Sequence, residues 1–245
     1  MNHEHPPVEL AIWHDLECGA YETDLSSWER HAEAAEDPIL DLGCGTGRVS
    51  LHLARRGHTV VGLDRDEGLV AAFNERARGL PAEAVAADAR EFDLDRRFGL
   101  ILAPMQIVQL LGGREERIRC LACVARHLLP GGRAAIAIVD GLVPAPDDGP
   151  PSLPDAREVD GWVYSSLPLV TAFDGGLIVV RRLRQTVSPG GELSEDVDEV
   201  SLWEISAPQL EEEARAAGLE PLGREEIPAS EDHIGSTVIL LERAA

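Results

Sequence analysis

Residues 38–48, with the sequence PILDLGCGTGR, constrain the fold of this chain more than any other segment. Three apolar residues lead into Asp41, the glycines Gly43, Gly45 and Gly47 follow, and an apolar pattern with helical period comes directly after them. This order predicts a buried parallel strand that runs into a glycine loop and then opens a helix. Glycine suits such a loop because the backbone turns sharply and a ligand can approach without meeting Cβ atoms. The free N–H groups at the helix start predict a site for a polar or anionic group.

The segments around this loop alternate between apolar strand patterns and helical patterns. Further strands are predicted at 58–64, 84–88, 98–104 and 133–140, and helices at 47–56, from 66 to about 78, and at 114–129. Gly57 is placed to end the first of these helices and residues 130–132 to close the last. Such alternation is typical of a parallel sheet with helices on both faces, so we predict a doubly wound α/β fold.

The alternation of predicted strands and helices ends after residue 142. Residues 143–154 are rich in Pro, Asp and Gly and predict a surface loop. Three apolar runs separated by turn sequences then predict an antiparallel meander at 162–170, 177–187 and 197–205. Ser206 opens a last predicted helix, and two strands at about 221–227 and 236–242 complete the chain.

Composition disfavours several classes of function. The formal net charge is −22, with 44 acidic against 22 basic residues, and the chain contains no lysine. Without a basic patch we expect no nucleic-acid partner, and without a lysine amine Schiff-base chemistry is excluded. We interpret the acidic excess as a solvated surface. Because no signal-peptide pattern and no apolar run of membrane-spanning length is visible, we expect a soluble, cytoplasmic protein with reduced cysteines and no membrane contact.

Carboxylates end three successive predicted strands. These are Asp41, Asp64 and Asp88, and open α/β sheets bind ligands beyond the carboxyl ends of their strands. An acid after the second strand suits a ribose, because one carboxylate accepts hydrogen bonds from both hydroxyls. A single Asp here is better explained as a helix cap, but three beside a glycine loop favour a nucleoside-containing ligand. A dinucleotide fingerprint needs two residues between Gly45 and Gly47, and this loop has one, so a pyrophosphate is disfavoured.

Residues 39–47 resemble the first motif of class I S-adenosylmethionine-dependent methyltransferases, and the resemblance covers about 38–139. It includes Asp64, the pair Asp88–Ala89, and the Leu-Leu-Pro-Gly-Gly sequence at 128–132. It implies a mostly parallel seven-stranded sheet and methyl transfer from S-adenosylmethionine to a nitrogen or oxygen of a small molecule, leaving S-adenosylhomocysteine. The antiparallel run resembles the insertion that many small-molecule methyltransferases carry after the fifth strand.

The resemblance also implies a set of cofactor contacts. The glycine loop would pass the methionine part, Asp64 would hold the ribose hydroxyls, and Asp88–Ala89 would lie by the adenine. Cys44 is interpreted as a packing residue whose backbone meets the cofactor. The implied cofactor-binding residues are Tyr21, Asp41, Gly43, Cys44, Gly45, Gly47, Asp64, Arg65, Asp88, Ala89, Pro104 and Met105.

We therefore predict one methyltransferase domain over residues 1–245. Its parts are an N-terminal helical lid (1–36), a cofactor-binding core (37–142), an antiparallel β insertion (143–205), and a final helix with a strand pair (206–245). The aromatic residues Trp13, Tyr21 and Trp28 of the first part either cover the site or pack in a core. The insertion either lines a pocket or forms the surface of a homodimer.

The acceptor side of the site is less defined. Residues 103–106 read Ala-Pro-Met-Gln, where families acting on adenine amino groups carry an Asn/Asp-Pro-Pro-Tyr-type sequence, so nucleobase methylation is disfavoured. Gln106 orients an acceptor or caps the next helix, and His14 (with Asp15) and His233 are the other substrate-side candidates. We assign no catalytic base, because one is needed only if the acceptor must lose a proton.

Two further clusters have simpler interpretations. Cys120, Cys123 and His127 share one side of a predicted helix, but a fourth ligand is missing, so we expect packing and no metal. Arg181–Arg182 and Arg184 form a solvated face or bind a substrate carboxylate. Two other function classes stay open. One is a non-catalytic cofactor-binding or scaffold protein of this fold, and the other is a nucleotide-dependent oxidoreductase, which the glycine spacing disfavours.

Overall fold

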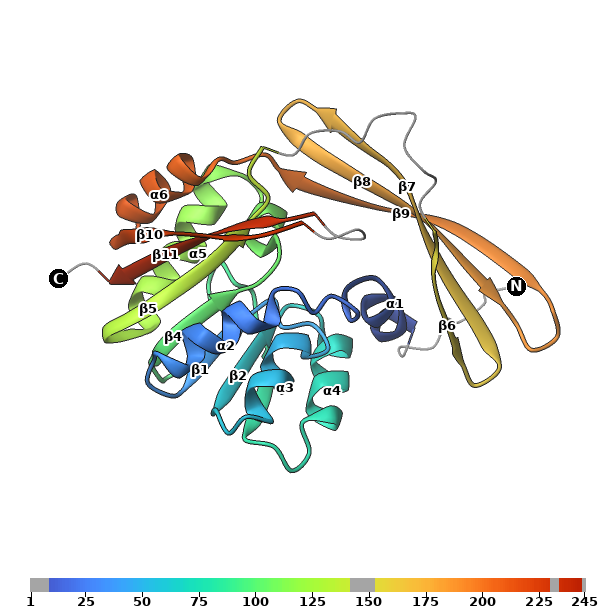
Figure 1. The fold of residues 1–245 in the computed structure, drawn as a ribbon, viewed down its shortest axis with the longest axis horizontal. Helices are drawn as coiled ribbons and strands as arrows, with labels where there is room; N and C mark the ends of the chain where they lie inside the picture. Colours follow the sequence, from blue (N-terminus) through green and yellow to red (C-terminus); the bar gives the residue numbers. More distant parts are fainter. Residues whose placement is uncertain (1–8, 142–152, 230–233, 244–245) are drawn as a thin grey trace. The chain divides into compact units, whose positions relative to one another are not determined.

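The computed structural model describes residues 9–141, 153–229 and 234–243. The contacts divide the chain into two compact units (Figure 1). One unit comprises Tyr21–Gly141 with Ile205–Ala245, and the other comprises Met1–Ala20 with Leu142–Glu204. No helix among the described residues is long and apolar enough to span a membrane.

The larger unit is built on a seven-stranded sheet in the order β10-β11-β5-β4-β1-β2-β3. All neighbouring strands are parallel except β11, which runs antiparallel to both β5 and β10. The strand order reverses between β1 and β4, which makes the carboxyl ends of these two strands the expected place for a ligand. The strands are β1 (Ile39–Leu42), β2 (Val60–Asp64), β3 (Ala82–Ala86), β4 (Phe98–Ala103), β5 (Leu128–Ile138), β10 (Leu219–Ile227) and β11 (Ser236–Arg243).

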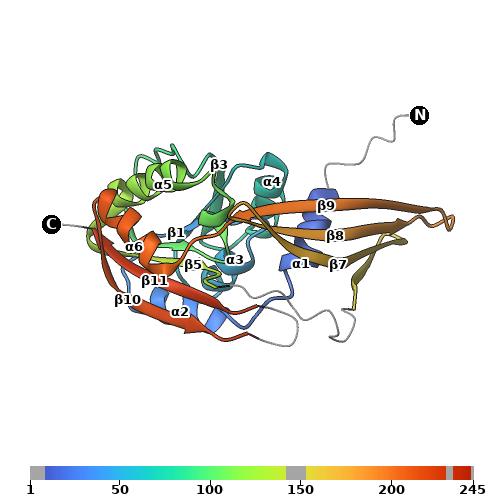
Figure 2. The same ribbon diagram turned by 90° about the horizontal axis from the view of Figure 1, so that it is seen from above.

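Helices cover both faces of this sheet, as the alternating pattern predicts (Figure 2). On one face, Leu121 and Leu210 pack against the apolar side chains of β4 and β5. On the other face, Trp28 and Leu53 pack against Ile39 and its neighbours. The helices are α2 (Leu25–Glu33), α3 (Arg48–Ala54), α4 (Glu67–Arg76), α5 (Arg114–His127) and α6 (Ala207–Ala216), with a 3₁₀ turn η1 (Ile107–Leu110).

The smaller unit is a four-stranded antiparallel sheet in the order β6-β7-β8-β9. The helix α1 (Glu9–Cys18) packs on one face of this sheet, where the ring of Trp13 meets that of Tyr164 edge-on with centroids 5.3 Å apart. Glu17 binds the same face, because it accepts hydrogen bonds from Nε and Nη2 of Arg184 and from Oγ of Ser166. The strands are β6 (Asp155–Val159), β7 (Trp162–Asp174), β8 (Leu177–Val187) and β9 (Leu193–Trp203).

Beyond shifted bounds, the structure differs from the predicted elements in the following ways. The strand β6 has no counterpart among the predictions, because its residues are polar or exposed and show no apolar run. Helix α5 ends at His127, and residues 130–132, expected to close it, belong to β5 instead. Leu128 is buried and pairs with Phe98, so the chain enters the sheet directly, with a register irregularity after that pair. The two N-terminal helices also separate: α1 belongs to the smaller unit and α2 to the larger.

A buried ion pair joins α5 to α6 in the larger unit. Nε and Nη2 of Arg117 donate to the two carboxylate oxygens of Glu213, at 2.8 and 2.7 Å, and both side chains are less than a tenth exposed. Removing one partner of such a pair leaves an uncompensated charge in a medium of low polarity.

We therefore expect Glu213→Ala to lower the free energy of unfolding by about 3–5 kcal/mol, measured by urea denaturation followed by tryptophan fluorescence. The variant Glu212→Ala is the control, because Glu212 lies next in the same helix with its side chain 75% exposed. Replacing both Arg117 and Glu213 by leucine should recover most of the loss. Equal losses for the Glu212 and Glu213 variants would contradict this account.

Candidate functional site

The glycine loop between β1 and α3 requires glycine at two positions for packing reasons. Gly43 and Gly47 have φ of +67° and +98°, a region that other residues rarely adopt. A Cβ at Gly43 would lie 2.2 Å from the side chain of Ile107, and one at Gly47 would lie 2.8 Å from Leu51 and Phe73. The positive φ values fit the sharp turn expected from the sequence, and the close packing against neighbouring side chains is a further reason for glycine that the sequence did not reveal.

Main-chain hydrogen bonds tie this loop to the end of β2. The N–H groups of Gly43 and Cys44 both donate to the carbonyl of Leu63, at 2.7 and 3.1 Å. The N–H of Gly45 donates to Oδ2 of Asp64 at 2.9 Å, while Oδ1 accepts from the N–H of Asp66 at 3.0 Å. Each oxygen of Asp64 thus accepts one hydrogen bond and keeps a lone pair for a ligand.

Asp41, at the end of β1, is buried with 1% of its surface exposed. Oδ2 accepts a hydrogen bond from Oγ of Ser50 at 2.6 Å, and Oδ1 has no partner among the described residues. Burial disfavours the charged form and raises the pKa of this carboxyl to about 6, against the opposing effects of Ser50 and Arg48. The same environment raises the pKa of the buried Cys44 thiol far above its ordinary value, so this cysteine stays protonated and fills space.

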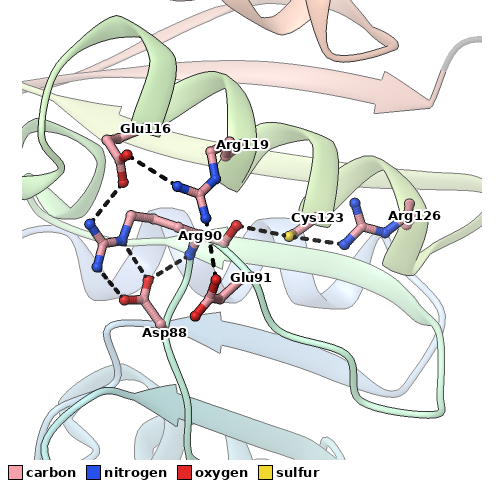
Figure 3. A network of polar contacts seen from close by, with 7 residues as sticks. All are labelled: Asp88, Arg90, Glu91, Glu116, Arg119, Cys123 and Arg126. Carbon is pink, nitrogen blue, oxygen red and sulfur yellow. Dashed lines mark hydrogen bonds and ion pairs between the residues drawn. The ribbon is translucent and has the colours of Figure 1, made fainter.

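Asp88 lies two residues beyond the end of β3, in a network of charged side chains (Figure 3). Arg90 donates to both carboxylate oxygens of Asp88, and its Nη1 donates to Glu116 on α5 at 2.8 Å. These hydrogen bonds, aided by the charge of Arg65, lower the pKa of Asp88 to about 2. Arg65 itself is exposed, and Ala89 packs partly buried against the core.

The turn after β4 is held in an unusual conformation. Pro104 is buried, and Met105 has φ +56°, which is uncommon for a residue other than glycine. The side chain of Gln106 makes no capping hydrogen bond, although its carbonyl accepts from the N–H of Gln109 at 2.9 Å. The fully buried Gln109 donates to the carbonyl of Val139 and accepts from its N–H, at 3.2 and 2.7 Å, which fixes this turn to the end of β5.

An ion pair that sequence reasoning missed fixes residues 21–28 to the start of α3. Nη1 and Nη2 of Arg48 donate to the two oxygens of Asp24, at 2.6 and 2.7 Å, and Asp24 is 1% exposed. Nη1 also donates to the carbonyl of Tyr21 at 2.7 Å, and the guanidinium carbon lies 5.2 Å from the centre of that ring. The only available signal was an arginine directly after the last glycine of the loop.

The structure brings most of the predicted cofactor residues to one edge of the large sheet. The loop with Asp41, then Asp64, Asp88 and Met105 lie at or just beyond the carboxyl ends of β1, β2, β3 and β4 respectively. His14 belongs to the smaller unit, where the adjacent Asp15 pairs with Arg157, and His233 lies outside the described residues.

Two clusters noted in the sequence are engaged in packing and ion pairs. Nδ1 of His127 donates to the carbonyl of Cys123 at 2.8 Å, and Nε2 accepts from the N–H of Leu94 at 3.1 Å, so both ring nitrogens bind the backbone. Arg181 pairs with Glu199. Of the other insertion arginines, Arg182 bonds Ser166 and Asp155, and Arg184 bonds Glu17 and Asp198.

Comparison with known proteins identifies this region. Residues 39–132 match the family model described as a methyltransferase domain. The cypemycin N-terminal methyltransferase of a Streptomyces species is 35% identical over 102 residues, which is 42% of each chain. The dTDP-3-amino-3,6-dideoxy-alpha-D-glucopyranose N,N-dimethyltransferase of Streptomyces fradiae is 33% identical over 109 residues, 44% of this chain and 42% of that one. These matches thus span less than half the length of either relative.

Solved structures agree on the fold over nearly the whole chain. A sugar N-methyltransferase from Streptoalloteichus has a TM-score of 0.73 with 19% identity, covering 100% of this chain and 96% of the other. An S-adenosylmethionine-dependent methyltransferase from Clostridium acetobutylicum has a TM-score of 0.72 with 16% identity, covering 97% and 98%. Residues 39–132 are therefore a class I methyltransferase domain, and the expected sheet with its antiparallel insertion is confirmed.

The burial of Asp41 predicts a pH dependence of stability. Its carboxyl has a pKa near 3.8 when unfolded and about 6 when folded, so the folded state binds more protons between these values. The stabilising contribution of the protonated Asp41 carboxyl to the free energy of unfolding is complete below pH 4, and it is lost as the pH rises through 6. Between pH 4 and 7 the free energy of unfolding should fall by ~2 kcal/mol more in wild type than in Asp41→Asn. Urea denaturation across this range measures it, with the exposed Glu75→Gln as control. Parallel curves for wild type and Asp41→Asn would contradict the shift.

Proposed function

We propose that this chain transfers a methyl group from S-adenosylmethionine to a small-molecule acceptor. The observation that carries this proposal is Asp64, whose two oxygens brace the glycine loop and still each have a lone pair for the hydroxyls of a ribose. Its position at the end of β2, beside the reversal of strand order, is where a nucleoside binds in open α/β sheets.

The charges around the loop fit a cationic cofactor. Asp41 has a buried oxygen without a partner among the described residues, and such an atom suits an ammonium donor. The loop itself carries no basic side chain, and the guanidinium of the adjacent Arg48 is bound to Asp24. A pyrophosphate at the loop would meet the carboxylates of Asp41 and Asp64, which disfavours a nicotinamide dinucleotide.

When bound, S-adenosylmethionine supplies an electrophilic methyl group on a sulfonium. The protein then has to hold the donor and the acceptor in line and close together, which by itself removes much of the barrier. Asp64 would bind the ribose, Asp88 and Ala89 would lie by the adenine, and the loop of Gly43, Gly45 and Gly47 would pass the methionine part. Cys44, Arg65, Pro104 and Met105 would contribute to the walls, and Tyr21 would face the cofactor.

The acceptor is proposed to be a small molecule with an amine or hydroxyl nucleophile. Support comes from the Streptomyces fradiae relative and from two further similar proteins, all named as methyltransferases of amino sugars. On the acceptor side, Gln106 has a side-chain amide that makes no capping hydrogen bond and is partly exposed, so it can orient a polar acceptor. His14 and His233 remain candidates for taking up a proton.

Titration calorimetry with S-adenosylhomocysteine tests the cofactor site. Wild type should bind it, and Asp64→Asn should weaken binding by about 10–150-fold, corresponding to ~1.5–3 kcal/mol for charge-assisted hydrogen bonds. Glu67→Gln, three residues further on in the exposed first turn of α4, should leave the affinity unchanged. Absence of binding to wild type would contradict the proposal. Tight binding of NAD instead would favour an oxidoreductase, and cofactor binding without methyl transfer to a panel of amines and alcohols would favour a non-catalytic protein.

We further propose that the sheet of the smaller unit forms a homodimer through the face opposite α1. Val163, Val187 and Leu193 form one cross-strand row on that face, and Leu167, Leu183 and Val197 form another. Val163, Leu193 and Val197 are 41%, 58% and 52% exposed. The face also carries the pair Arg181–Glu199, whose opposite charges let a second copy related by two-fold symmetry complement it.

Light scattering after size exclusion tests this proposal. Wild type should have the mass of a dimer, and Val197→Asp should have the mass of a monomer, because the carboxylate would be buried at the interface. Val200→Asp is the matched control, since Val200 is an exposed valine of the same strand but lies on the other face. A monomeric wild type, or dissociation by both variants alike, would contradict the assignment of the face.

A further inference from the structure

Arg90 holds the carboxylate of Asp88 in a fixed orientation. Its Nε donates to Oδ1 at 2.8 Å, its Nη2 donates to Oδ2, and its backbone N–H donates to Oδ1 at 2.8 Å (Figure 3). A two-pronged contact between guanidinium and carboxylate fixes the plane of the carboxylate as well as its position. Asp88 therefore cannot rotate freely, although its side chain is 29% exposed.

Arg90 is itself held from the opposite side by α5. Its Nη1 donates to Oε2 of Glu116 at 2.8 Å, and Oε1 of Glu116 accepts from Arg119 at 3.2 Å. Arg119 also donates to Glu91 at 3.2 Å, which closes the network on the loop that carries Asp88. The guanidinium thus joins the loop after β3 to the first turn of α5, and its three donor groups are all engaged.

Asp88 is a carboxylate at neutral pH, and the same network favours this form further. Hydrogen bonds from Arg90 lower its pKa to about 2, and as a carboxylate it acts only as an acceptor. Each oxygen of a carboxylate can accept more than one hydrogen bond, which leaves capacity for a ligand beside the bonds from Arg90. Such a group binds an amino substituent and repels a carbonyl oxygen.

Asp88 lies where a base attached to a ribose at Asp64 would extend. Asp64 pairs with Ala86 across β2 and β3, and the N–H of Ala87 donates to the carbonyl of Asp64 at 2.9 Å. Asp88 is the next residue, so the two carboxylates sit at the ends of neighbouring parallel strands, which lie about 4.8 Å apart.

We propose that Arg90 is a positioning residue that orients Asp88 as an acceptor for the 6-amino group of the cofactor's purine, so that the site selects adenine over a 6-oxopurine. The proposal rests on the proposed function of the site. Arg90 acts through Asp88 and needs no contact with the cofactor. A site built to accept a hydrogen bond from a ligand N–H discriminates strongly against the analogue that lacks it, because the acceptor is then left unpaired.

Calorimetry with two ligands tests the role of Arg90. S-adenosylhomocysteine and S-inosylhomocysteine differ in whether C6 of the purine carries an amino group or an oxygen. Wild type should prefer the adenosyl compound by about 10–100-fold, as for one hydrogen bond to a charged group. Arg90→Ala should reduce this preference to within about threefold, chiefly by weakening the adenosyl compound.

Further variants separate positioning from charge and from general destabilisation. Arg90→Lys keeps the charge but lacks the planar fork, so its preference should also be reduced. Glu116→Gln should lower the preference in part, because it weakens the hold on Nη1 of Arg90. Arg96→Ala is the matched control: it removes an exposed arginine and its ion pair with Glu83 without touching Asp88, Arg90 or Glu116, and the preference should stay as in wild type.

The outcomes distinguish this inference from the proposed function. Failure of wild type to bind S-adenosylhomocysteine would contradict the proposed function itself. Three results would each contradict the role of Arg90 without contradicting the cofactor site. These are equal binding of both ligands to wild type, an unchanged preference in a folded Arg90→Ala, and a fully retained preference in Arg90→Lys.

Discussion

The candidate site depends on the hydrogen bonds that join the glycine loop to the end of β2. Two loop N–H groups converge on the carbonyl of Leu63, and a third donates to the side chain of Asp64. Because β1 and β2 are parallel neighbours in register, from Ile39 with Val60 to Leu42 with Leu63, both strands end at the same level. A loop leaving β1 can therefore cross directly over β2, and the carboxylate at its end becomes part of the loop's own support.

The central part of this arrangement could be predicted from the sequence because its signals are local. Three glycines at alternate positions and acids after successive apolar runs lie within short segments, and the family match over residues 39–132 agrees with them. The bounds of the third strand show that local sequence patterns place strand ends only approximately. This strand was expected at 84–88 but spans Ala82–Ala86, so Asp88 lies beyond it, in the loop where Arg90 can reach back to it.

The remaining features depend on contacts between residues far apart in the chain, and no short pattern reveals them. Arg48 pairs with Asp24, and Arg90 pairs with Glu116; the partners are separated by 24 and 26 residues in the sequence. Because the chain contains many acidic residues, the sequence does not show which one each arginine binds. The N-terminal helices present the same difficulty. Both carry a tryptophan, yet Trp13 packs against Tyr164 of the insertion, whereas Trp28 joins the core of the large sheet. Whether either helix covers the site stays a prediction.

Three arginines lie near the proposed site, and two of them are bound to acids, whereas the third, Arg65, is exposed beside Asp64. Arg48 is bound by Asp24, and Arg90 by Asp88 together with Glu116, so neither presents an unbalanced positive charge. Asp64 has no ion pair among the described residues and accepts only from backbone N–H groups. With the carboxylates of Asp41 and Asp64 against the single exposed guanidinium of Arg65, we expect a negative field near the ribose and methionine positions proposed here. Such a field attracts a sulfonium and an ammonium, and it repels the phosphates that other glycine loops bind.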